Sequence, residues 1–392
     1  MTGLLERLAR LAAPGRAELA SPPDAKASRT AALFAFHGPG EPVWTARDFR
    51  SLSHEGYEKN PVVHRCVRLV AEAVSSVPWL VFEGDAELAE HPLLKLLARP
   101  NAGMDGQRFI EAVTGYMLVA GNAYVEAVTL NDELRELHVL RPDRMKVVTG
   151  GDGWPSAYEY TVGAQSVRFD QDVSPAPILH LSTFHPTDDH YGMSPLEAAR
   201  AALDIHNRAS AWTMALLENA ARPSGALVYT AESGLSREQY ERLKSELETS
   251  FQGAANAGRP LLLEGGLDWR AMAMTPKDMD FAEARNAAAR DIALCFGVPP
   301  MLLGIPGDNT YANYAEANRA FWRHTVLPML TRLSGAFSGW LGPAFGDVRL
   351  AHDLDAIHAL SADRDALWKR VSDAAFLTDD EKRIAVGYGT RE

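Results

Sequence analysis

The sequence predicts an α+β fold divided into several modules. Three observations predict it. Strand-like stretches meander without regular crossover helices up to residue 185, three long helical patterns follow, and a short αβ stretch separates the first two of them. A chain of 392 residues has room for more than one core of ordinary domain size.

The composition argues against two classes of protein. Hydrophobic residues make up 46% and charged residues 23% of the chain, as in an ordinary globular protein. The formal net charge of −12 argues against a protein that wraps nucleic-acid phosphates and against a polybasic membrane anchor. No stretch reaches the roughly 18 apolar residues of a membrane-spanning helix. Cys66 and Cys295 fall on apolar helix faces and are expected to be buried, reduced thiols.

Residues 1–45 are predicted to form a disordered or adaptable arm. The start, MTGLLERLARLAAPG, mixes acidic with basic residues, and its apolar run is too broken for a signal peptide. The stretch after it is rich in Ala, Ser and Pro, a composition that buries little apolar surface. We therefore expect a short amphipathic piece followed by a disordered stretch.

A helix is predicted to begin after Asn60. Asn is a favoured N-cap, and Pro61 loses nothing by its missing N–H at the first helical position. Pro78 ends the run, and apolar side chains recur at helical spacing before it: Val63, Cys66, Val67, Val70, Val74 and Val77. One face of this helix should be buried.

Short helices and strands follow up to residue 185. We expect a strand at 79–84, helices at 91–101 and 105–120, and strands at 123–130 and 136–150. The second of these helices should face inward with Phe109, Val113, Tyr116 and Met117. The glycine cluster at 150–153 predicts a hairpin turn, because it lacks the lysine and following helix of a phosphate loop.

Two long helices are predicted on either side of a small unit. The first begins with the capping-box pair Ser194 and Glu197 and can run to about residue 221, on the order of 40 Å. The second begins at Thr275 and ends at Gly297. The inward positions are Leu196, Ala199, Leu203, Trp212 and Leu216 in the first helix and Phe281, Ala288, Ile292 and Cys295 in the second.

The unit between them has about fifty residues, too few to be stable alone. GALVYT predicts a strand, and Ser236 with Gln239 a capping box at the start of a helix. Leu235 and Tyr240 form a hydrophobic staple, and the helix face carries Tyr240, Leu243, Leu247 and Phe251. A two-stranded hairpin is expected around Gly265 and Gly266.

The C-terminal part is predicted to be helical. A third long helix should span 311–341 with a kink at Pro328, since proline removes a backbone donor. Two short helices close the chain, one at 362–376 and one capped by Thr378 and Glu381.

One polar cluster offers a chemical alternative. Three histidines and two carboxylates could ligate zinc or a divalent nuclease metal, which would make the chain a metal-dependent hydrolase or nuclease: His180, His185, Asp188, Asp189 and His190. Their spacing differs from that of a helical His-x-x-x-His pair, and the stretch is expected to be a turn, where exposed His and Asp are common. We therefore predict no catalytic residue, metal site or cofactor.

The remaining polar residues favour structural roles. A solvated connection is expected at His352, Asp353, Asp355 and His358, and ordinary turn and cap residues at Asp308, Asn309 and Thr310. Helical histidines expected to be structural are His64, His206 and His324. No Walker loop, nucleophile elbow or dinucleotide fingerprint is present in the sequence.

Short motifs follow one another in a specific order over about residues 55–390. They are Asn60-Pro61-Val62-Val63, Pro78-Trp79, His91-Pro92-Leu93, Pro100-Asn101, Gly121-Asn122-Ala123-Tyr124, Leu140-Arg141-Pro142-Asp143, His180, Gly192-Met193-Ser194-Pro195-Leu196, Asp280-Phe281, Arg285, Ile292, Phe296-Gly297-Val298-Pro299-Pro300 and Leu303-Gly304. In this order they resemble the portal proteins of tailed phages, in the compact type of Hong Kong ninety-seven-like phages.

The resemblance implies a portal-type subunit made of named modules. These are an arm at 1–45, a wing at 46–192, stem helices at 193–222 and 275–297, a clip at 223–274, a tunnel loop at 298–312, a kinked wing helix and connection at 313–352, and a short crown at 353–392. The crown is short for the family, which leaves open whether the particle is a phage, a prophage remnant or a gene transfer agent.

The resemblance also implies a function without enzymatic activity. Such proteins form a ring, expected to be a dodecamer, at one capsid vertex of a virion or phage-like particle assembled in the bacterial cytoplasm. Double-stranded DNA is packaged and ejected through the ring, and the implied partners are the terminase large subunit, the head-tail adaptor and the major capsid protein, with no membrane.

The implied contact residues fall in two places. The tunnel loop would face DNA with Gly304, Ile305, Pro306, Gly307, Asp308, Asn309, Thr310 and Tyr311. The clip would dock terminase or adaptor with Tyr229, Arg237, Tyr240, Lys244, Arg259 and Trp269. Twelve chains of charge −12 give a ring of about −144, so an acidic channel would repel phosphates and touch DNA with few Lys or Arg side chains.

Overall fold

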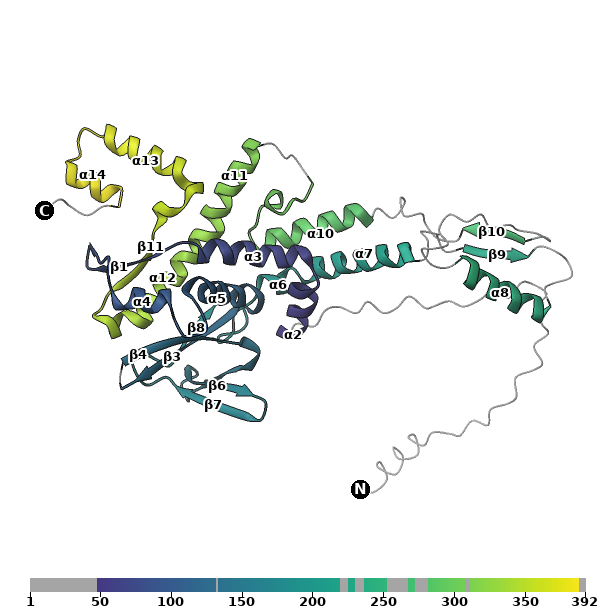
Figure 1. The fold of residues 1–392 in the computed structure, drawn as a ribbon, viewed down its shortest axis with the longest axis horizontal. Coiled ribbons are helices and arrows are strands. Elements are labelled where there is room, and N and C mark those ends of the chain that lie inside the picture. The colour runs from purple at the N-terminus through teal and green to yellow at the C-terminus, as the bar shows by residue number, and fades with distance from the viewer. Residues whose placement is uncertain are drawn as a thin grey trace, which may run out of the picture. The chain divides into compact units, whose positions relative to one another are not determined.

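The computed structural model describes residues 48–131, 133–218, 225–229, 236–251, 267–271, 281–306 and 311–387, drawn in Figure 1. These residues fall into two compact units. The smaller unit contains the described residues from 225 to 271, and the larger unit contains all the others. The predicted arm lies outside the described residues.

The first helices of the larger unit confirm the predicted start at Asn60. Helix α2 (Phe49–Leu52) and the π-helical turn η1 (Ser53–Glu58) precede α3 (Pro61–Ser75), whose N-cap Asn60 accepts hydrogen bonds from the next backbone N–H groups. All six predicted inward residues are buried: Val63, Cys66, Val67, Val70, Val74 and Val77. Their burial anchors α3 in the main core.

The next helices pack onto this core as expected. Strands β1 (Trp79–Glu83) and β2 (Ala86–Glu87) lead to α4 (Pro92–Ala98) and α5 (Gly106–Ala120). Helix α5 packs against α3, and its predicted inward residues Phe109, Val113 and Met117 are buried, whereas Tyr116 is half-buried. Gly121 then ends α5 in the left-handed conformation, with φ 71°.

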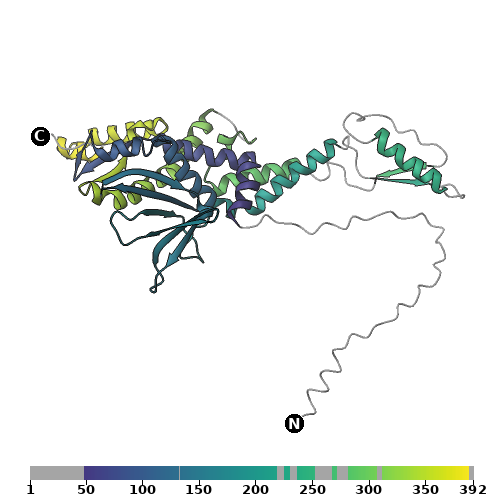
Figure 2. The ribbon, with the colours of Figure 1, turned by 60° about the horizontal axis from the view of Figure 1, so that its bottom comes forward.

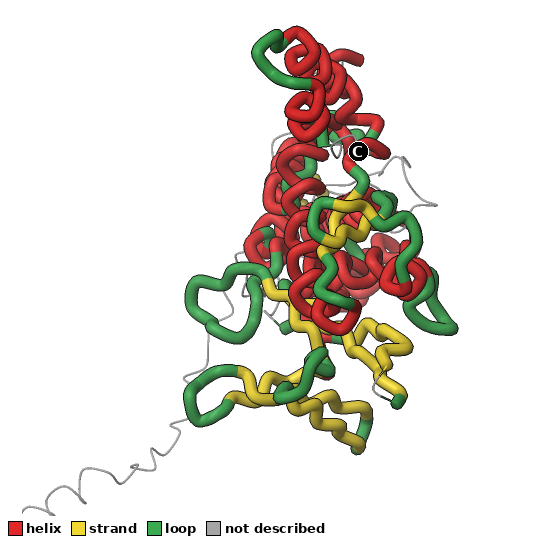
Figure 3. The backbone as a smooth tube through the Cα atoms, turned by 90° about the vertical axis from the view of Figure 1, so that its left-hand side faces the viewer, coloured by secondary structure: helices red, strands yellow, loops and turns green. Residues whose placement is uncertain are grey.

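Two antiparallel sheets lie on the same side of the α3 and α5 helices (Figures 1 and 3). One has the order β4-β3-β8, and the other has the order β5-β6-β7. The strands are β3 (Asn122–Leu130), β4 (Glu133–Leu140), β5 (Met145–Thr149), β6 (Pro155–Val162), β7 (Gln165–Asp170) and β8 (Ile178–Ser182). The hairpin predicted at 150–153 is confirmed by the pairing of β5 with β6.

The prediction of one strand over 136–150 is wrong. The chain leaves the first sheet at Leu140, passes through the 3-10 turn η2 (Pro142–Arg144), and enters the second sheet as β5. Pro142 cannot donate to a strand ladder, so it suits a turn between two sheets. A small cluster of Tyr124, Leu140, Met145, Val147, Tyr158 and Ile178 fills the space between these sheets.

A third sheet of order β11-β1-β2 contains a strand that was not predicted. Strand β11 (Arg349–His352) pairs antiparallel with β1, and His352 lies opposite Trp79 with ring centroids 4.0 Å apart. His352 is buried, so the expected solvated connection is wrong at this residue. Asp353, Asp355 and His358 are not buried, as expected.

The two long helices lie side by side in Figures 1 and 2. The first is divided at Ala199 into α6 (Pro195–Ala198) and α7 (Arg200–Glu218), whereas one continuous helix was predicted; the second is α10 (Phe281–Cys295). The rings of Trp212 and Phe281 lie 4.1 Å apart. The predicted inward residues are buried at Leu196, Ala199, Leu203, Ala288 and Ile292 and half-buried at Trp212, Phe281 and Cys295, and the side chain of Leu216 lies outside the described ones.

The described residues of the smaller unit form a two-stranded sheet and one helix. Strand β9 (Gly225–Tyr229) pairs antiparallel with β10 (Leu267–Ala271), and α8 (Arg237–Phe251) lies between them in sequence. The capping box is confirmed, because the Ser236 and Gln239 side chains each accept a bond from the other's backbone N–H, at 3.2 and 2.9 Å. Leu235, the first strand of the predicted hairpin, and the side chains of Leu243, Leu247 and Phe251 lie outside the described part.

The third long helix is interrupted in a different way from the one predicted. Helix α11 (Tyr311–Phe321) is followed by a π-helical turn, η5 (Trp322–Val326), and then by α12 (Leu327–Leu341). Pro328 therefore lies directly after the π turn, in the first turn of α12, and cannot donate a backbone hydrogen bond to the turn before it. The wider π turn replaces the kink expected within a continuous helix.

The C-terminal segment is built from short helices. After η6 (Gly342–Phe345) and β11 come η7 (Leu354–Ala356), η8 (His358–Leu360), α13 (Ser361–Asp373) and α14 (Asp379–Ala385). The capping box of Thr378 and Glu381 is confirmed at the start of α14.

One main core unites the larger unit. Buried residues of α3, α5, α10 and α12 form it, and Phe337 contacts Trp79 and Phe109 edge-on, with centroid distances of 5.8 and 6.2 Å. Trp340 donates through Nε1 to the Ala176 carbonyl at 2.7 Å, so its polar atom is satisfied. Among the described helices, none is long and apolar enough to cross a membrane.

Candidate functional site

The loop that follows α10 is fixed at its first turn. Gly297 ends the helix in the left-handed conformation, with φ 64°, and its carbonyl accepts a hydrogen bond from Thr325 Oγ1 of η5 at 2.5 Å. A Cβ at Gly297 would lie 2.6 Å from the same Thr325 oxygen. The positive φ and the close approach of the Thr325 side chain therefore both favour glycine here.

The described part of the loop is also fixed at its far end. The 3-10 turn η4 (Pro300–Leu303) ends at Gly304, with φ 72°. The Ile305 N–H donates to the Pro300 carbonyl at 3.3 Å, and the Arg290 guanidinium of α10 donates to the Pro306 carbonyl. The chain thus leaves the helical body at Pro306 from a position set by α10.

The predicted tunnel-loop residues differ in exposure within the subunit. Gly304 and Pro306 are exposed, whereas Ile305 is 8% exposed. Their role in facing DNA stays a prediction. Residues 307–310 and the side chain of Tyr311 lie outside the described part.

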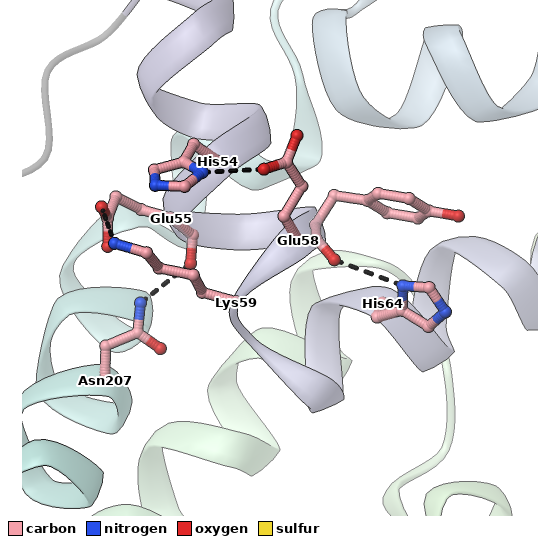
Figure 4. Close-up of polar contacts among 7 residues, drawn as sticks. His54, Glu55, Glu58, Lys59, His64 and Asn207 are labelled. Atoms are coloured by element: carbon pink, nitrogen blue, oxygen red, sulfur yellow. Dashed lines mark hydrogen bonds and ion pairs between the residues drawn. The ribbon is translucent and has the colours of Figure 1, made fainter.

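A polar network joins α7 to the first helices. The Asn60 side chain caps α3 with its oxygen, and its Nδ2 donates to Asn207 Oδ1 at 2.8 Å and to His206 Nδ1 at 2.9 Å. Asn207 Nδ2 in turn donates to the Glu55 carbonyl at 2.9 Å (Figure 4). Asn60 and His206 are buried, so these bonds satisfy groups that water cannot reach.

The network confirms that His206 is structural. Burial lowers the pKa of His206, and the nearby Arg285 lowers it further, so the ring is held neutral as a hydrogen-bond acceptor. The sequence identified Asn60 as a cap but gave no signal for its bonds to α7. Around the network, Figure 4 shows the pairs His54–Glu58 and Lys59–Glu55, each 2.7 Å apart, which are exposed and add little stability.

The predicted metal ligands do not converge. His180 lies in β8, stacked on Tyr124 with ring centroids 4.3 Å apart, and its two nitrogens contact Asn122 Oδ1 at 3.0 Å and Tyr158 Oη at 3.3 Å. Burial lowers the pKa of His180 to about 4, so its ring is neutral near pH 7.

The rest of that cluster forms local turn bonds. His185 Nδ1 accepts from the Thr187 N–H at 3.2 Å, and Asp188 Oδ1 accepts from the N–H groups of His190 and Tyr191. Across the described residues, no group of three or more His, Cys, Asp and Glu side chains could hold a metal ion. The hydrolase or nuclease alternative therefore receives no support.

The cysteines are free thiols, as predicted. Cys66 is buried, and burial raises its pKa to about 12, which makes it unreactive at neutral pH. Cys295 is half-buried, and burial raises its pKa as well.

Three of the residues expected to dock partners have described side chains. Arg237, Tyr240 and Lys244 lie on α8 and are exposed within the smaller unit. Tyr229 and Trp269 belong to β9 and β10, but their side chains, like the whole of Arg259, lie outside the described part. Their docking role stays a prediction.

Comparison with known proteins gives consistent matches across most of the chain. The family described as phage portal protein matches residues 61–387. The portal protein of Enterobacteria phage HK97 is 28% identical over 351 residues, covering 85% of this chain and 80% of the phage protein.

Two solved structures are more similar in sequence. A chain in the neck of an empty GTA particle, computed with C6 symmetry, is 55% identical and has a TM-score of 0.72, covering 90% of this chain and 96% of that chain. A chain in the neck of a native GTA particle, computed with C12 symmetry, is 55% identical and has a TM-score of 0.69. The match covers 90% of this chain and 97% of that chain.

Proposed function

Because the chain belongs to the phage portal protein family, we propose that it forms a ring at one vertex of a phage-like particle, through which double-stranded DNA is packaged and ejected. The observation that carries the proposal is the 55% identity, over 90% of this chain, with a chain in the neck of a gene transfer agent particle. At this identity, we infer that the particle built by this chain is also of the gene-transfer-agent type.

The ring would contain twelve copies, in keeping with the C12 symmetry of the native neck. In a cyclic ring each subunit meets its two neighbours through two different surfaces. The paired helices α7 and α10 would serve as the stem, and the smaller unit would serve as the clip that docks the terminase and the head-tail adaptor. Arg237, Tyr240 and Lys244 lie on α8 and are exposed in the smaller unit.

The segment Gly304 to Tyr311 would be the tunnel loop. Arg290 and Thr325 fix its base to α10 and η5, so displacement of the loop by passing DNA would be transmitted to these helices. The residues at 307–310, Gly-Asp-Asn-Thr, offer short polar side chains, which suit steric and weak polar contact with DNA and no chemistry.

Deletion of Gly307–Thr310 tests the role of the loop. Particles assembled with the deleted chain should package or retain less DNA, while the ring still assembles with the wild-type number of subunits. A matched variant replaces the four residues with Gly-Ser-Gly-Ser and separates loop length from loop sequence. Unchanged packaging in both variants would remove the loop from the mechanism.

Alanine at both His185 and His190 tests the enzymatic alternative. The His185 side chain accepts a local turn bond, and His190 takes part in the turn through its backbone N–H, which alanine keeps, so the variant should form rings and support packaging at the wild-type level. A metal-dependent hydrolase would lose its activity in the same variant.

A further inference from the structure

A groove in the larger unit is lined by residues of α2, η1, α3 and α5. Its volume is about 810 Å³, within the roughly 300–1,000 Å³ of pockets that hold small ligands. Apolar side chains form much of its lining, buried at Val67, Ala71 and Val119 and half-buried at Phe49 and Tyr116. The groove therefore has the size and the apolar character to take one large aromatic side chain.

Two features of the groove are not explained by packing among the described residues. Gly115 of α5 lines the groove, and no described atom lies within 4 Å of a Cβ at this position, although glycine weakens a helix interior. Ser53 Oγ of η1 is buried and makes no hydrogen bond with the described residues, which is costly for a hydroxyl. An occupant with one large side chain and backbone polar groups would account for both features.

The described chain begins beside this groove. Asp48 is the extended N-cap of α2, with ψ 151°, and the next residue, Phe49, lines the groove. The sequence before Asp48, at 42–47, is Pro-Val-Trp-Thr-Ala-Arg. Four extended residues span about 13 Å, so a chain that leaves Asp48 brings Trp44 within reach of the groove.

The charges at the groove are compatible with this segment. Among the described residues, acidic and basic side chains line the groove in equal numbers: Glu58, Asp105 and Glu111 against Arg68, Arg108 and Arg141. This balance favours neither a polyanion nor a polycation. Residues 42–47 carry a single charge, on Arg47, and so meet no strong repulsion there.

We propose that residues 42–47 lie in this groove of their own subunit, with the Trp44 indole in the open space at Gly115. The short tether to Asp48 gives Trp44 an effective concentration on the order of millimolar at the groove, an advantage that a separate partner lacks. Docking would fix the point from which residues 1–41 leave the larger unit. The inference goes beyond the proposed function and does not depend on the ring, because all of its contacts lie within one subunit.

Trypsin cleavage after Arg47 of the full-length protein tests the proposal. Trp44→Ala should speed this cleavage by about tenfold or more, since the segment loses the burial of its indole and is released more often. Phe36→Ala, in the same arm but outside the segment, is the matched control and should leave the rate unchanged. Gly115→Leu fills the groove and should also speed the cleavage, whereas Gly339→Leu, on α12 with equally open space at its Cβ, should not.

A photo-crosslink identifies what occupies the groove. p-Benzoylphenylalanine at position 44 of the full-length chain should link to peptides of η1, α3 or α5, in products with the mass of one copy. Unchanged cleavage after Arg47 in both Trp44→Ala and Gly115→Leu would overturn the inference. A crosslinked product with the mass of two copies would also overturn it, because the segment would then lie on another subunit. Neither result concerns ring formation, so the proposed function would stand in both cases.

Discussion

The Asn60 side chain makes hydrogen bonds with two helices, α3 and α7. Its oxygen caps α3, and its amide nitrogen donates to His206 and Asn207 of α7. Asn60→Ala should lower the free energy of unfolding by about 2–3 kcal/mol, because it removes a cap and leaves buried acceptors unpaired. Urea unfolding followed by circular dichroism measures this loss.

Asp105→Ala is the matched control for Asn60. Asp105 caps α5 through one bond to the Arg108 N–H, at 2.7 Å, and its side chain makes no other hydrogen bond with the described residues. Asp105→Ala should lower the free energy of unfolding by about 1 kcal/mol. Equal losses in the two variants would mean that the bonds from Asn60 to α7 contribute nothing.

Two histidines with lowered pKa values should make stability depend on pH. Burial lowers the pKa values of His180 and His352 to about 4, from an ordinary value near 6.5, so the unfolded chain binds more protons between these values. Stability is therefore fully present above about pH 6.5 and falls as the pH drops toward 4, by about 3 kcal/mol for each histidine.

His352→Phe isolates one of these contributions. His352 Nε2 is buried without a hydrogen-bond partner among the described residues, so a phenyl ring stacked on Trp79 should cost little at pH 7.5. At pH 5 the variant should melt at a higher temperature than the wild type. The same difference in melting temperature at both pH values would rule out His352 as a titrating group.

At the scale of elements, comparing Gly297 with Gly304 distinguishes the stability cost of a positive φ from the stability cost of close packing. Both have positive φ, but only Gly297 would place a Cβ against Thr325, whereas nothing lies within 4 Å of a Cβ at Gly304. Gly304→Ala should lower the free energy of unfolding by about 1 kcal/mol. Gly297→Ala should lower it by about 2–3 kcal/mol, because this substitution also disturbs the bond from Thr325. Thermal unfolding of the two variants compares them, and equal shifts would contradict the proposed tight junction between α10 and η5.

Elements with local signals were predictable from the sequence. The Asn60 cap, the capping boxes of α8 and α14, and the hairpin at 150–153 depend on residues a few positions apart, and the structure confirms them. Strand β11 was not predictable, because four residues become a strand only by pairing with β1, far away in the chain.

Two features of the candidate site also depend on distant contacts. The burial of Ile305 and the bond from Arg290 to the Pro306 carbonyl depend on how α10 lies beside the loop, which no local pattern encodes.

The π turn before Pro328 was missed because the proline alone predicts an interruption of the helix without specifying its form.

At the scale of the whole molecule, charge should keep DNA mobile. A ring of twelve chains of charge −12 would carry about −144 and would be expected to repel phosphates. Purified rings should therefore bind duplex DNA weakly between about 50 and 200 mM salt. Tight binding that weakens steeply as salt rises would contradict an acidic, non-retaining channel.

The ring itself is the central claim, and negative-stain electron microscopy of the purified full-length protein tests it most directly. The account predicts closed rings of twelve subunits with a central hole, matching the C12 symmetry of the native GTA neck. A stable monomer under the same conditions would contradict it.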